Sequence, residues 1–367
     1  PHNLREVISA VVALIDNPEL DGPALRKLVK GPDFPTGGYI YGRAGIADYQ
    51  DTGRGRIVMR ARAVIEERES SGKSQIVVTE VPYQSNPGKL VADIAELVRE
   101  QKLTGISELR NESDRDGIRI VIGLKRDAIP RVVLNQLYKH TSMQSTFGVI
   151  MLALVPDPNT RQLVPKVLTL KQCLEHYIAH RHEVIIRRTQ FDLDKALERE
   201  HILEGLKIAV DNIDEVIKLI RAADDTPTAS TQLQARFGLS ERQAEAILNM
   251  RLAKLTGLER DKLEEELAEV RAFIIDMRGI LESRTRRMNI LKGELMALSE
   301  SFGDDRRTEI VSDDGEFSIE DLIADEEMVV TISHNGYIKR TPASLYKKQG
   351  RGGRGKSGAD LKENDFI

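Results

Sequence analysis

Tryptophan is absent from this 367-residue sequence, and aromatic residues together make up only 4% of it. Large pockets lined by aromatic side chains are therefore not expected. Cys173 is the only cysteine, which excludes an internal disulfide and a thiolate zinc cluster and fits a reducing cytoplasm. No apolar run approaches the roughly 20 residues that a membrane-spanning helix needs. We therefore expect a cytoplasmic protein with no membrane partner.

An excess of positive charge is also missing, because the formal net charge is −4. Binding to nucleic acid would have to come from local basic patches rather than from the chain as a whole. Hydrophobic residues at 40% and charged residues at 31% are typical of a soluble, rather helical protein. The length allows two or three domains.

Both ends lack the signals of a natural terminus. Pro1 to Leu4 shows neither an initiator methionine nor a signal peptide, and Asn364 to Ile367 stops without a capping signal. We expect the sequence to be an internal segment of a longer chain.

Residues 1–165 mix short strand patterns with helical ones, which predicts an α+β unit. Helices are expected over Leu4–Ile15, Lys89–Lys102 and Ala128–His140. A strand over 56–65 should pair with Gln75–Val81 through a turn near Ser70–Lys73. The apolar side of that strand is formed by Ile57, Met59, Ala61, Ala63 and Ile65.

The other side of the same strand carries Arg56, Arg60 and Arg62, and Arg54 lies in the glycine-rich loop before it. Neighbouring like charges repel unless an anion faces them, and DNA phosphate is one such anion. A solvated sheet face with two glutamates nearby explains the same residues without a ligand. Both interpretations remain open, and we predict that the four arginines face DNA.

Apolar residues recur at alternating steps of four and three from Leu263 to Phe302, and Arg284 is the only exception. Sustained heptads predict a coiled coil. One helix from Glu259 to Phe302 would span roughly 65 Å at 1.5 Å per residue. The helical region from Leu170 onward should therefore form a long antiparallel coiled-coil arm over residues 166–305.

Short helices at about 222–258 should form a knob at the tip of the arm. This stretch has too few residues to enclose a core of its own, yet it carries a cluster of apolar side chains. A second copy could cover that cluster by two-fold symmetry, which predicts a homodimer. The residues concerned are Ile247, Leu248, Met250, Leu252 and Leu255.

Charge changes abruptly along the last part of the chain. Residues 306–327 read as an acidic linker, and residues 328–367 begin as a basic β element whose Asn335-Gly336 predicts a hairpin. Gly350–Ser357 matches a phosphate-loop pattern, but the strand before it and the parallel sheet after it are missing. The same glycines and cations suit either a DNA phosphate backbone or a flexible solvated loop.

Catalytic signals are weak throughout. His176 and His180 are spaced to share a metal on a helix, but no third ligand is evident, so we expect no metal site. No nucleophile–base pair stands in a convincing context, and we assign no catalytic residue.

Taken in order, several motifs resemble the A subunits of bacterial DNA gyrases, which are type IIA DNA topoisomerases. The resemblance covers essentially the whole chain. It is carried by Asn3–Val7, Gly31–Thr36, Thr52–Gly55, Val81–Gln84, Glu112–Gly117, Ser145–Gly148, Arg181–Val184, His201–Leu206, Gln243–Leu248, Leu255–Glu259, Phe302–Thr308 and the gyrase-box-like Gln349–Gly355.

The resemblance implies a tower domain at 1–165, coiled-coil arms with a dimer-gate knob at 166–305, and the start of a DNA-wrapping β-pinwheel at 328–367. The partners that it implies are double-stranded DNA, a second copy of the same subunit for a homodimer, and the gyrase B subunit. In the family the catalytic tyrosine lies upstream of the matching segment. ATP and Mg²⁺ would act on the B subunit, so no cofactor is expected on this chain.

Two residues depart from the family pattern. The box consists here of Gln349, Gly350, Arg351, Gly352, Gly353, Arg354 and Gly355. Its second residue is Gly350, whereas the family usually has a basic residue at that position. Pro87 stands where the family usually has lysine, and Lys89 supplies a cation nearby as an expected DNA contact. Topoisomerase IV, a non-catalytic coiled-coil DNA-binding scaffold and a phosphate-loop NTPase are the alternative functions.

Overall fold

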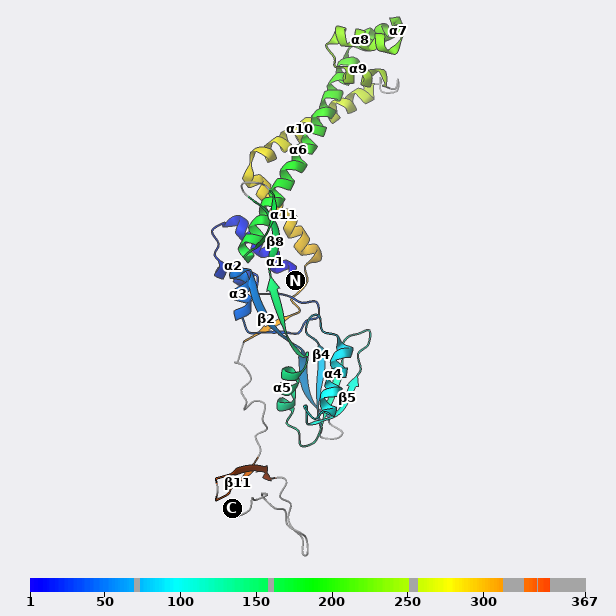
Figure 1. Ribbon diagram of the computed structural model, residues 1–367. Coiled ribbons are helices and arrows are strands. Elements are labelled where there is room, and N and C mark those ends of the chain that lie inside the picture. Colours follow the sequence, from blue (N-terminus) through cyan, green and yellow to red (C-terminus); the bar gives the residue numbers. More distant parts are fainter. Residues whose placement is uncertain (69–72, 158–161, 251–256, 313–326, 335, 344–367) are drawn as a thin grey trace.

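The computed structural model describes residues 1–68, 73–157, 162–250, 257–312, 327–334 and 336–343. Its N-terminal part is an α+β unit, and a long helical arm leads away from it to a small helical knob (Figure 1). The predicted α+β class is confirmed.

Two four-stranded sheets form the framework of the tower, which consists of residues 1–165 and of β10 from a later part of the chain. The first has the strand order β10-β1-β2-β7 and the second the order β3-β4-β6-β5. The strands of the first sheet are β1 (Tyr39–Tyr41), β2 (Arg54–Arg60), β7 (Gln144–Ile150) and β10 (Glu309–Val311). Those of the second are β3 (Arg62–Arg68), β4 (Lys73–Glu80), β5 (Ile106–Asn111) and β6 (Ile120–Leu124).

The strand predicted over 56–65 is in fact two strands. It divides at Ala61, which is fully buried, into β2 of the first sheet and β3 of the second. β2 pairs antiparallel with β7, and β3 pairs antiparallel with β4 as expected for the hairpin. The turn predicted near Ser70–Lys73 lies largely outside the described residues. The prediction of one continuous strand is therefore wrong, because its two halves pair with different neighbours.

The second sheet packs on two helices that begin with proline, α4 (Pro87–Arg99) and α5 (Pro130–His140). Proline is favoured in the first turn because its missing N–H would have no helical partner there. β6 is buried along its whole length, and its side chains meet those of both helices in one core. A separate hairpin, β8 (Leu152–Pro156) and β9 (Leu163–Val167), leads into the arm.

The predicted linker begins later than residue 306. Thr308 is buried and its hydroxyl binds the backbone of Phe34, and the next residues form β10, parallel to β1. Asp33 accepts backbone hydrogen bonds from Arg307 and Thr308. Residues 306–311 thus belong to the tower, where they pack beside α1 (Leu4–Asp16), α2 (Gly22–Leu28) and α3 (Ala44–Thr52).

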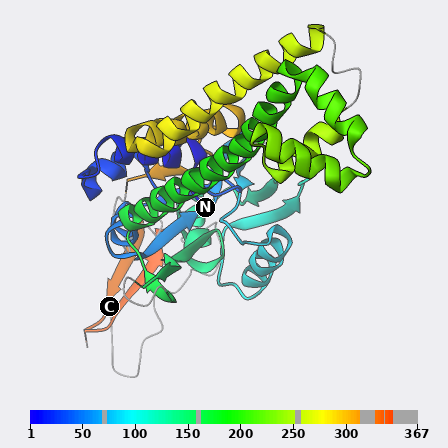
Figure 2. The same ribbon diagram turned by 90° about the horizontal axis from the view of Figure 1, so that it is seen from above.

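The arm consists of α6 (Leu170–Asp211), a 42-residue helix, and α10 (Gly257–Glu282), which returns along it (Figures 1 and 2). Thr169 and Gln172 form a capping box that fixes where α6 begins. Buried Leu193, Ala196 and Ile274 form the seam between the two helices. The predicted antiparallel pairing of the arm is confirmed.

The single helix predicted from Glu259 to Phe302 is wrong, because the chain breaks at Ser283. This residue caps a new helix, α11 (Arg284–Phe302), by accepting a hydrogen bond from the backbone N–H of Arg286. α11 packs against both α1 and the first part of α6, where Leu291 and Leu295 share a core with Ile185. The heptad pattern continues across the break. Its apolar residues face the seam between α6 and α10 before Ser283, and the core shared by α1 and the first part of α6 after it.

A buried arginine holds this break in shape. Arg287 is only 8% exposed, and its guanidinium donates to the carbonyl oxygens of Ile280 and Leu281 at the end of α10. Its Nε donates to Nε2 of His182 on α6 over 2.9 Å. An imidazole nitrogen can accept that bond only when it carries no proton, so His182 must be neutral with its proton on Nδ1.

This contact predicts a pH dependence. Burial, together with the charges of Arg287 and Arg284, holds the pKa of His182 below its ordinary value of 6.5. The unfolded chain therefore binds a proton at His182 more readily than the folded chain does. The stability that neutral His182 contributes is complete above about pH 6.5 and is lost as the pH falls below that value.

In His182→Gln, an amide oxygen can accept the same hydrogen bond from Arg287 without titrating. Unfolding in denaturant at about pH 7.5 and about pH 5 should show a smaller acid loss in this variant than in the wild type, and an equal loss would contradict the assignment.

The knob contains α7 (Ile213–Ala222), α8 (Thr226–Phe237) and α9 (Glu241–Leu248). Together with the end of α6 these helices enclose a core, in which Leu206 of α6, Leu233 and Ile247 are buried. Gly205 lets α9 approach α6, since a Cβ there would lie 2.7 Å from Cβ of Gln243. Gln243 in turn donates to the carbonyl oxygen of His201.

The apolar side chains of residues 222–258 are covered largely by α6 and α7 of the same chain, whereas the sequence pattern predicted that a second copy would cover them. Ile247 is only 3% exposed and faces the chain's own core, and Leu248 and Met250 pack partly against it. Leu252 and Leu255 lie outside the described residues. Ile247 is therefore a core residue and not a candidate for direct contact with a second copy.

The hairpin predicted around Asn335-Gly336 is confirmed. β11 (Met328–Ile332) pairs antiparallel with β12 (Ile338–Pro342), and Gly336 adopts a positive φ of 82°. The box residues Gln349–Gly355 and the phosphate-loop-like Gly350–Ser357 lie outside the described residues.

Candidate nucleic-acid interface

The start of β2 in the first sheet is held rigidly against α3. A Cβ on Gly45 of α3 would lie 1.8 Å from the backbone oxygen of Arg56, and one on Gly55 would lie 2.4 Å from the backbone oxygen of Gly45. Only glycine permits this approach between a helix and a strand. The backbone that carries Arg54 and Arg56 is therefore fixed by α3.

Arg54 and Arg56 themselves are exposed. Neither forms an ion pair or a side-chain hydrogen bond with another residue in the described part of the chain. Two guanidiniums on a rigid strand, two residues apart, point to the same side of the sheet. They are available to an anionic surface such as a phosphate backbone.

Arg60 and Arg62 are used differently. The guanidinium of Arg60 stacks 3.4 Å from the ring centre of Tyr41, and its Nε donates to Gln144. Arg62 forms ion pairs with Glu80 at 3.0 Å and Glu309 at 3.4 Å. Contacts within the chain thus stabilise both guanidinium groups. Repulsion between Arg60 and Arg62 therefore no longer indicates that an anionic ligand faces them.

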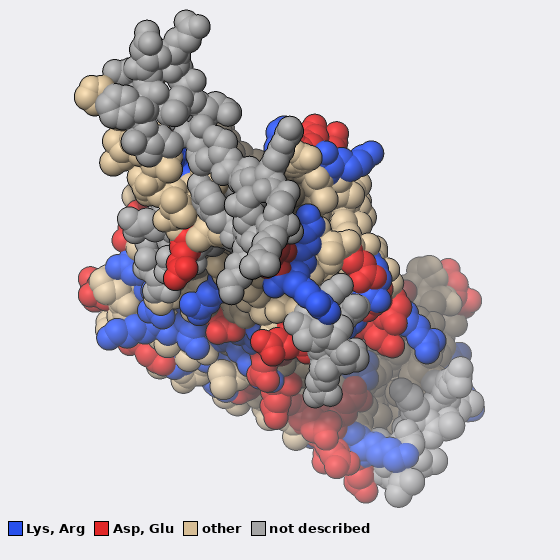
Figure 3. All heavy atoms as spheres, turned by 90° about the horizontal axis from the view of Figure 1, so that it is seen from below, with Lys and Arg blue, Asp and Glu red and all other residues tan. Residues whose placement is uncertain are grey.

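Lys89 lies on α4, which packs on the second sheet, so it belongs to a different part of the tower from Arg54 and Arg56. Its side chain is exposed, and its backbone N–H is capped by the side chain of Asn86. Pro87 occupies the first turn of the same helix, where it favours the helical start. Viewed from below, blue basic and red acidic side chains are interspersed over the surface (Figure 3).

Other candidate chemistry has little support among the described residues. No group of three or more His, Cys, Asp or Glu side chains there could hold a metal ion, so His176 and His180 gain no third ligand. Burial raises the pKa of the Cys173 thiol, which disfavours the reactive thiolate. No described helix is long and apolar enough to cross a membrane.

Comparison with known proteins then decides the family. Residues 1–296 match the family model of the DNA gyrase/topoisomerase IV A subunit. The chain belongs to this family. Residues 327–367 match the model of the DNA gyrase C-terminal domain, a β-propeller, so the hairpin β11–β12 begins a second family domain.

Whole-chain relatives carry the same family name. The sequence is 50% identical to the DNA gyrase A subunit of Clostridium acetobutylicum over 100% of this chain and 43% of that protein. It is 52% identical to the corresponding protein of Campylobacter fetus and 49% identical to that of Staphylococcus aureus, covering 42% and 41% of those proteins. The chain thus spans less than half the length of these gyrase proteins.

Proposed function

We propose that this chain is the DNA-supporting and gate-forming part of a DNA gyrase A subunit. The complete enzyme would introduce negative supercoils into double-stranded DNA through a double-strand break, strand passage and religation, at the expense of ATP. It would act as a heterotetramer in which ATP and Mg²⁺ bind the B subunit. The nucleophilic tyrosine would come from a part of the longer protein outside this chain.

Each part of the chain has a role in this proposal. The tower supports duplex DNA through Arg54 and Arg56, whose strand is fixed by α3. The arm formed by α6 and α10 holds the knob far from the tower, as an exit gate between two copies of the chain requires (Figure 1). Residues 328–367 begin the domain that wraps DNA.

The observation that carries the proposal is the match over the whole chain to gyrase proteins, including residues 327–367 of the wrapping domain. That match favours gyrase over topoisomerase IV, because the C-terminal family model is described as a gyrase domain. The box-like Gln349–Gly355 in the sequence favours the same choice.

DNA binding by the tower is tested with Arg54→Ala/Arg56→Ala. The double variant should bind a short duplex more weakly, and the slope of log K against log salt should fall by about one unit for each phosphate that is no longer neutralised. Arg187→Ala/Arg278→Ala removes the same charge from exposed positions on the arm and should leave the slope unchanged. Equal slopes for all three proteins would mean that β2 is merely solvated.

The dimer gate is tested by sedimentation of the chain at tens of micromolar, a concentration at which a modest interface should associate. We expect a dimer, and Met250→Glu should shift it toward monomer because Met250 is partly exposed beside the knob core. Ala272→Glu, at an exposed position on α10 of the arm, adds the same charge outside the knob as a control. Helix content by circular dichroism confirms that both variants remain folded. A monomeric wild type would overturn the gate.

A further inference from the structure

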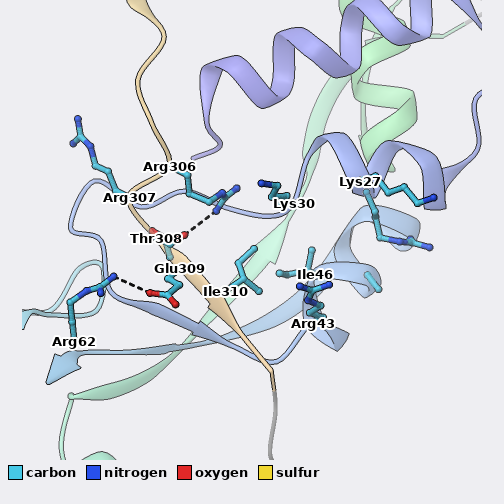
Figure 4. Close-up of a pocket in the computed structure, with 12 residues that line it drawn as sticks. Lys27, Lys30, Arg43, Ile46, Arg62, Arg306, Arg307, Thr308, Glu309 and Ile310 are labelled. Carbon is cyan, nitrogen blue, oxygen red and sulfur yellow. Dashed lines mark hydrogen bonds and ion pairs between the residues drawn. The ribbon is translucent and has the colours of Figure 1, made fainter. Parts of the chain in front are cut away.

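A basic cavity of about 860 Å³ lies in the tower, between the end of α2, the start of α3 and residues 306–310 (Figure 4). Seven of its twelve lining residues are lysine or arginine, and Glu309 is the only acidic one. Such a concentration of one charge is costly unless each cation has a partner or an anion enters.

Four of the seven cations do have partners within the chain. Each of them forms an ion pair with a carboxylate: Arg26 with Asp51, Arg62 with Glu80, Arg306 with Glu6 and Arg307 with Asp304. The remaining three are Lys27, Lys30 and Arg43, and their charged groups form no ion pair and no hydrogen bond with any described residue. The backbone N–H of Lys30 donates to the carboxylate of Glu6, but its ammonium group does not. Their positive charge is therefore not neutralised by the described part of the chain.

The cavity also has an apolar wall. Ile46 of α3 and Ile310 of β10 both line it, and their Cδ1 atoms would lie 2.9 and 3.3 Å from a Cβ placed on Gly31. Gly31 therefore lets the two isoleucine side chains pack close to its backbone, where they form one wall of the cavity. Volumes of roughly 300–1,000 Å³ are usual for small-molecule sites.

A compact anion fits this site better than duplex DNA does. A duplex carries about one charge per 1.7 Å along a rod, so it would cross the mouth of the cavity without reaching the wall. A short chain of phosphate groups can enter, and each phosphate can accept charge-assisted hydrogen bonds from lysine or arginine.

We propose that this cavity binds a compact polyphosphate, either inorganic or attached to a nucleoside, through Lys27, Lys30 and Arg43. The bound anion would link α2 and α3 to residues 306–310, which connect the arm to the β element at 328–342. The inference goes beyond the proposed function and does not depend on it, because none of these three residues is a predicted DNA contact.

Titration calorimetry of the whole chain tests the proposal, with sodium tripolyphosphate and with ATP in the presence of EDTA as probes. Lys30→Gln/Arg43→Gln should bind tripolyphosphate about 10-fold or more weakly than the wild type, because two charge-assisted hydrogen bonds are removed. Arg131→Gln/Lys139→Gln removes the same charge from exposed positions on α5, outside the cavity, and should bind like the wild type. Thermal unfolding of each variant confirms that the fold is intact.

The outcomes separate the two sources of phosphate. Equal binding of tripolyphosphate and ATP would show that the phosphate chain alone is recognised, and tighter binding of ATP would show that the nucleoside uses the Ile46–Ile310 wall. Both results support the site. Absence of saturable binding to the wild type, or equal affinity in the two double variants, would overturn it. So would loss of duplex binding in Lys30→Gln/Arg43→Gln without any tripolyphosphate binding, since the cavity would then be a DNA surface.

Discussion

Replacing Arg306 with methionine should lower the free energy of unfolding of the tower by about 3–5 kcal/mol. Arg306 is 16% exposed and makes two hydrogen bonds to the carboxylate of Glu6, which is 12% exposed. It also donates to the carbonyl oxygens of Gly31 and Pro32. Methionine would leave the charge of Glu6 largely buried with no cation beside it and only the backbone N–H of Lys30 as a donor, and this accounts for most of the loss. Unfolding in denaturant measures it.

The neighbouring residue provides a matched control. Arg307 pairs with Asp304, but both side chains are more than half exposed, so Arg307→Met should cost at most about 1 kcal/mol. In Glu6→Gln/Arg306→Met the unpaired charge is also removed, and part of the stability should return. A loss for Arg306→Met no larger than for Arg307→Met would show that this pair does not fix residues 306–311 to the tower.

Replacement of Gln349–Gly355 by alanines in the complete protein that contains this chain should abolish negative supercoiling while leaving relaxation or decatenation. The glycines and cations of this segment suit a strap on DNA that guides wrapping, and the segment is remote in sequence from the proposed nucleophile. The assay uses closed circular DNA, ATP and the B subunit, with the products resolved on a gel.

Alanines at Lys347 and Lys348 serve as the control for this replacement, because they remove two cations just before the box. That variant should keep most of its supercoiling activity. Simultaneous loss of DNA cleavage in the box variant would assign the segment to the cleavage step and would contradict a role in wrapping.

Much of the helical architecture could be predicted from the sequence because it follows from local periodicity. The arm was predictable from its heptads, and the hairpin of β11 and β12 from Asn335-Gly336. The break at Ser283 had a signal too, since Arg284 beside it is the one polar residue in the heptad series. A serine cap between two helices with the same apolar spacing gives no stronger local sign, so one helix was predicted where there are two.

The rest depended on contacts between distant residues. β10 has only three residues, and it pairs with β1 some 270 positions earlier in the chain. Because it begins an acidic stretch, the sequence pattern predicted a linker there instead of a strand. Arg60 and Arg62 resembled DNA contacts until their partners Tyr41, Gln144 and Glu80 were known. The basic cavity brings α2, α3 and residues 306–310 together, so no spacing in the sequence could indicate it.

The most direct test of the central claim is a supercoiling assay of the complete protein that contains this chain, mixed with relaxed closed circular DNA and the B subunit. With ATP and Mg²⁺, negative supercoils should accumulate, and without ATP the DNA should not become negatively supercoiled. A decatenase that only relaxes DNA, or a DNA-binding scaffold that leaves its topology unchanged, would produce no negative supercoils under either condition, and that result would contradict the assignment to gyrase.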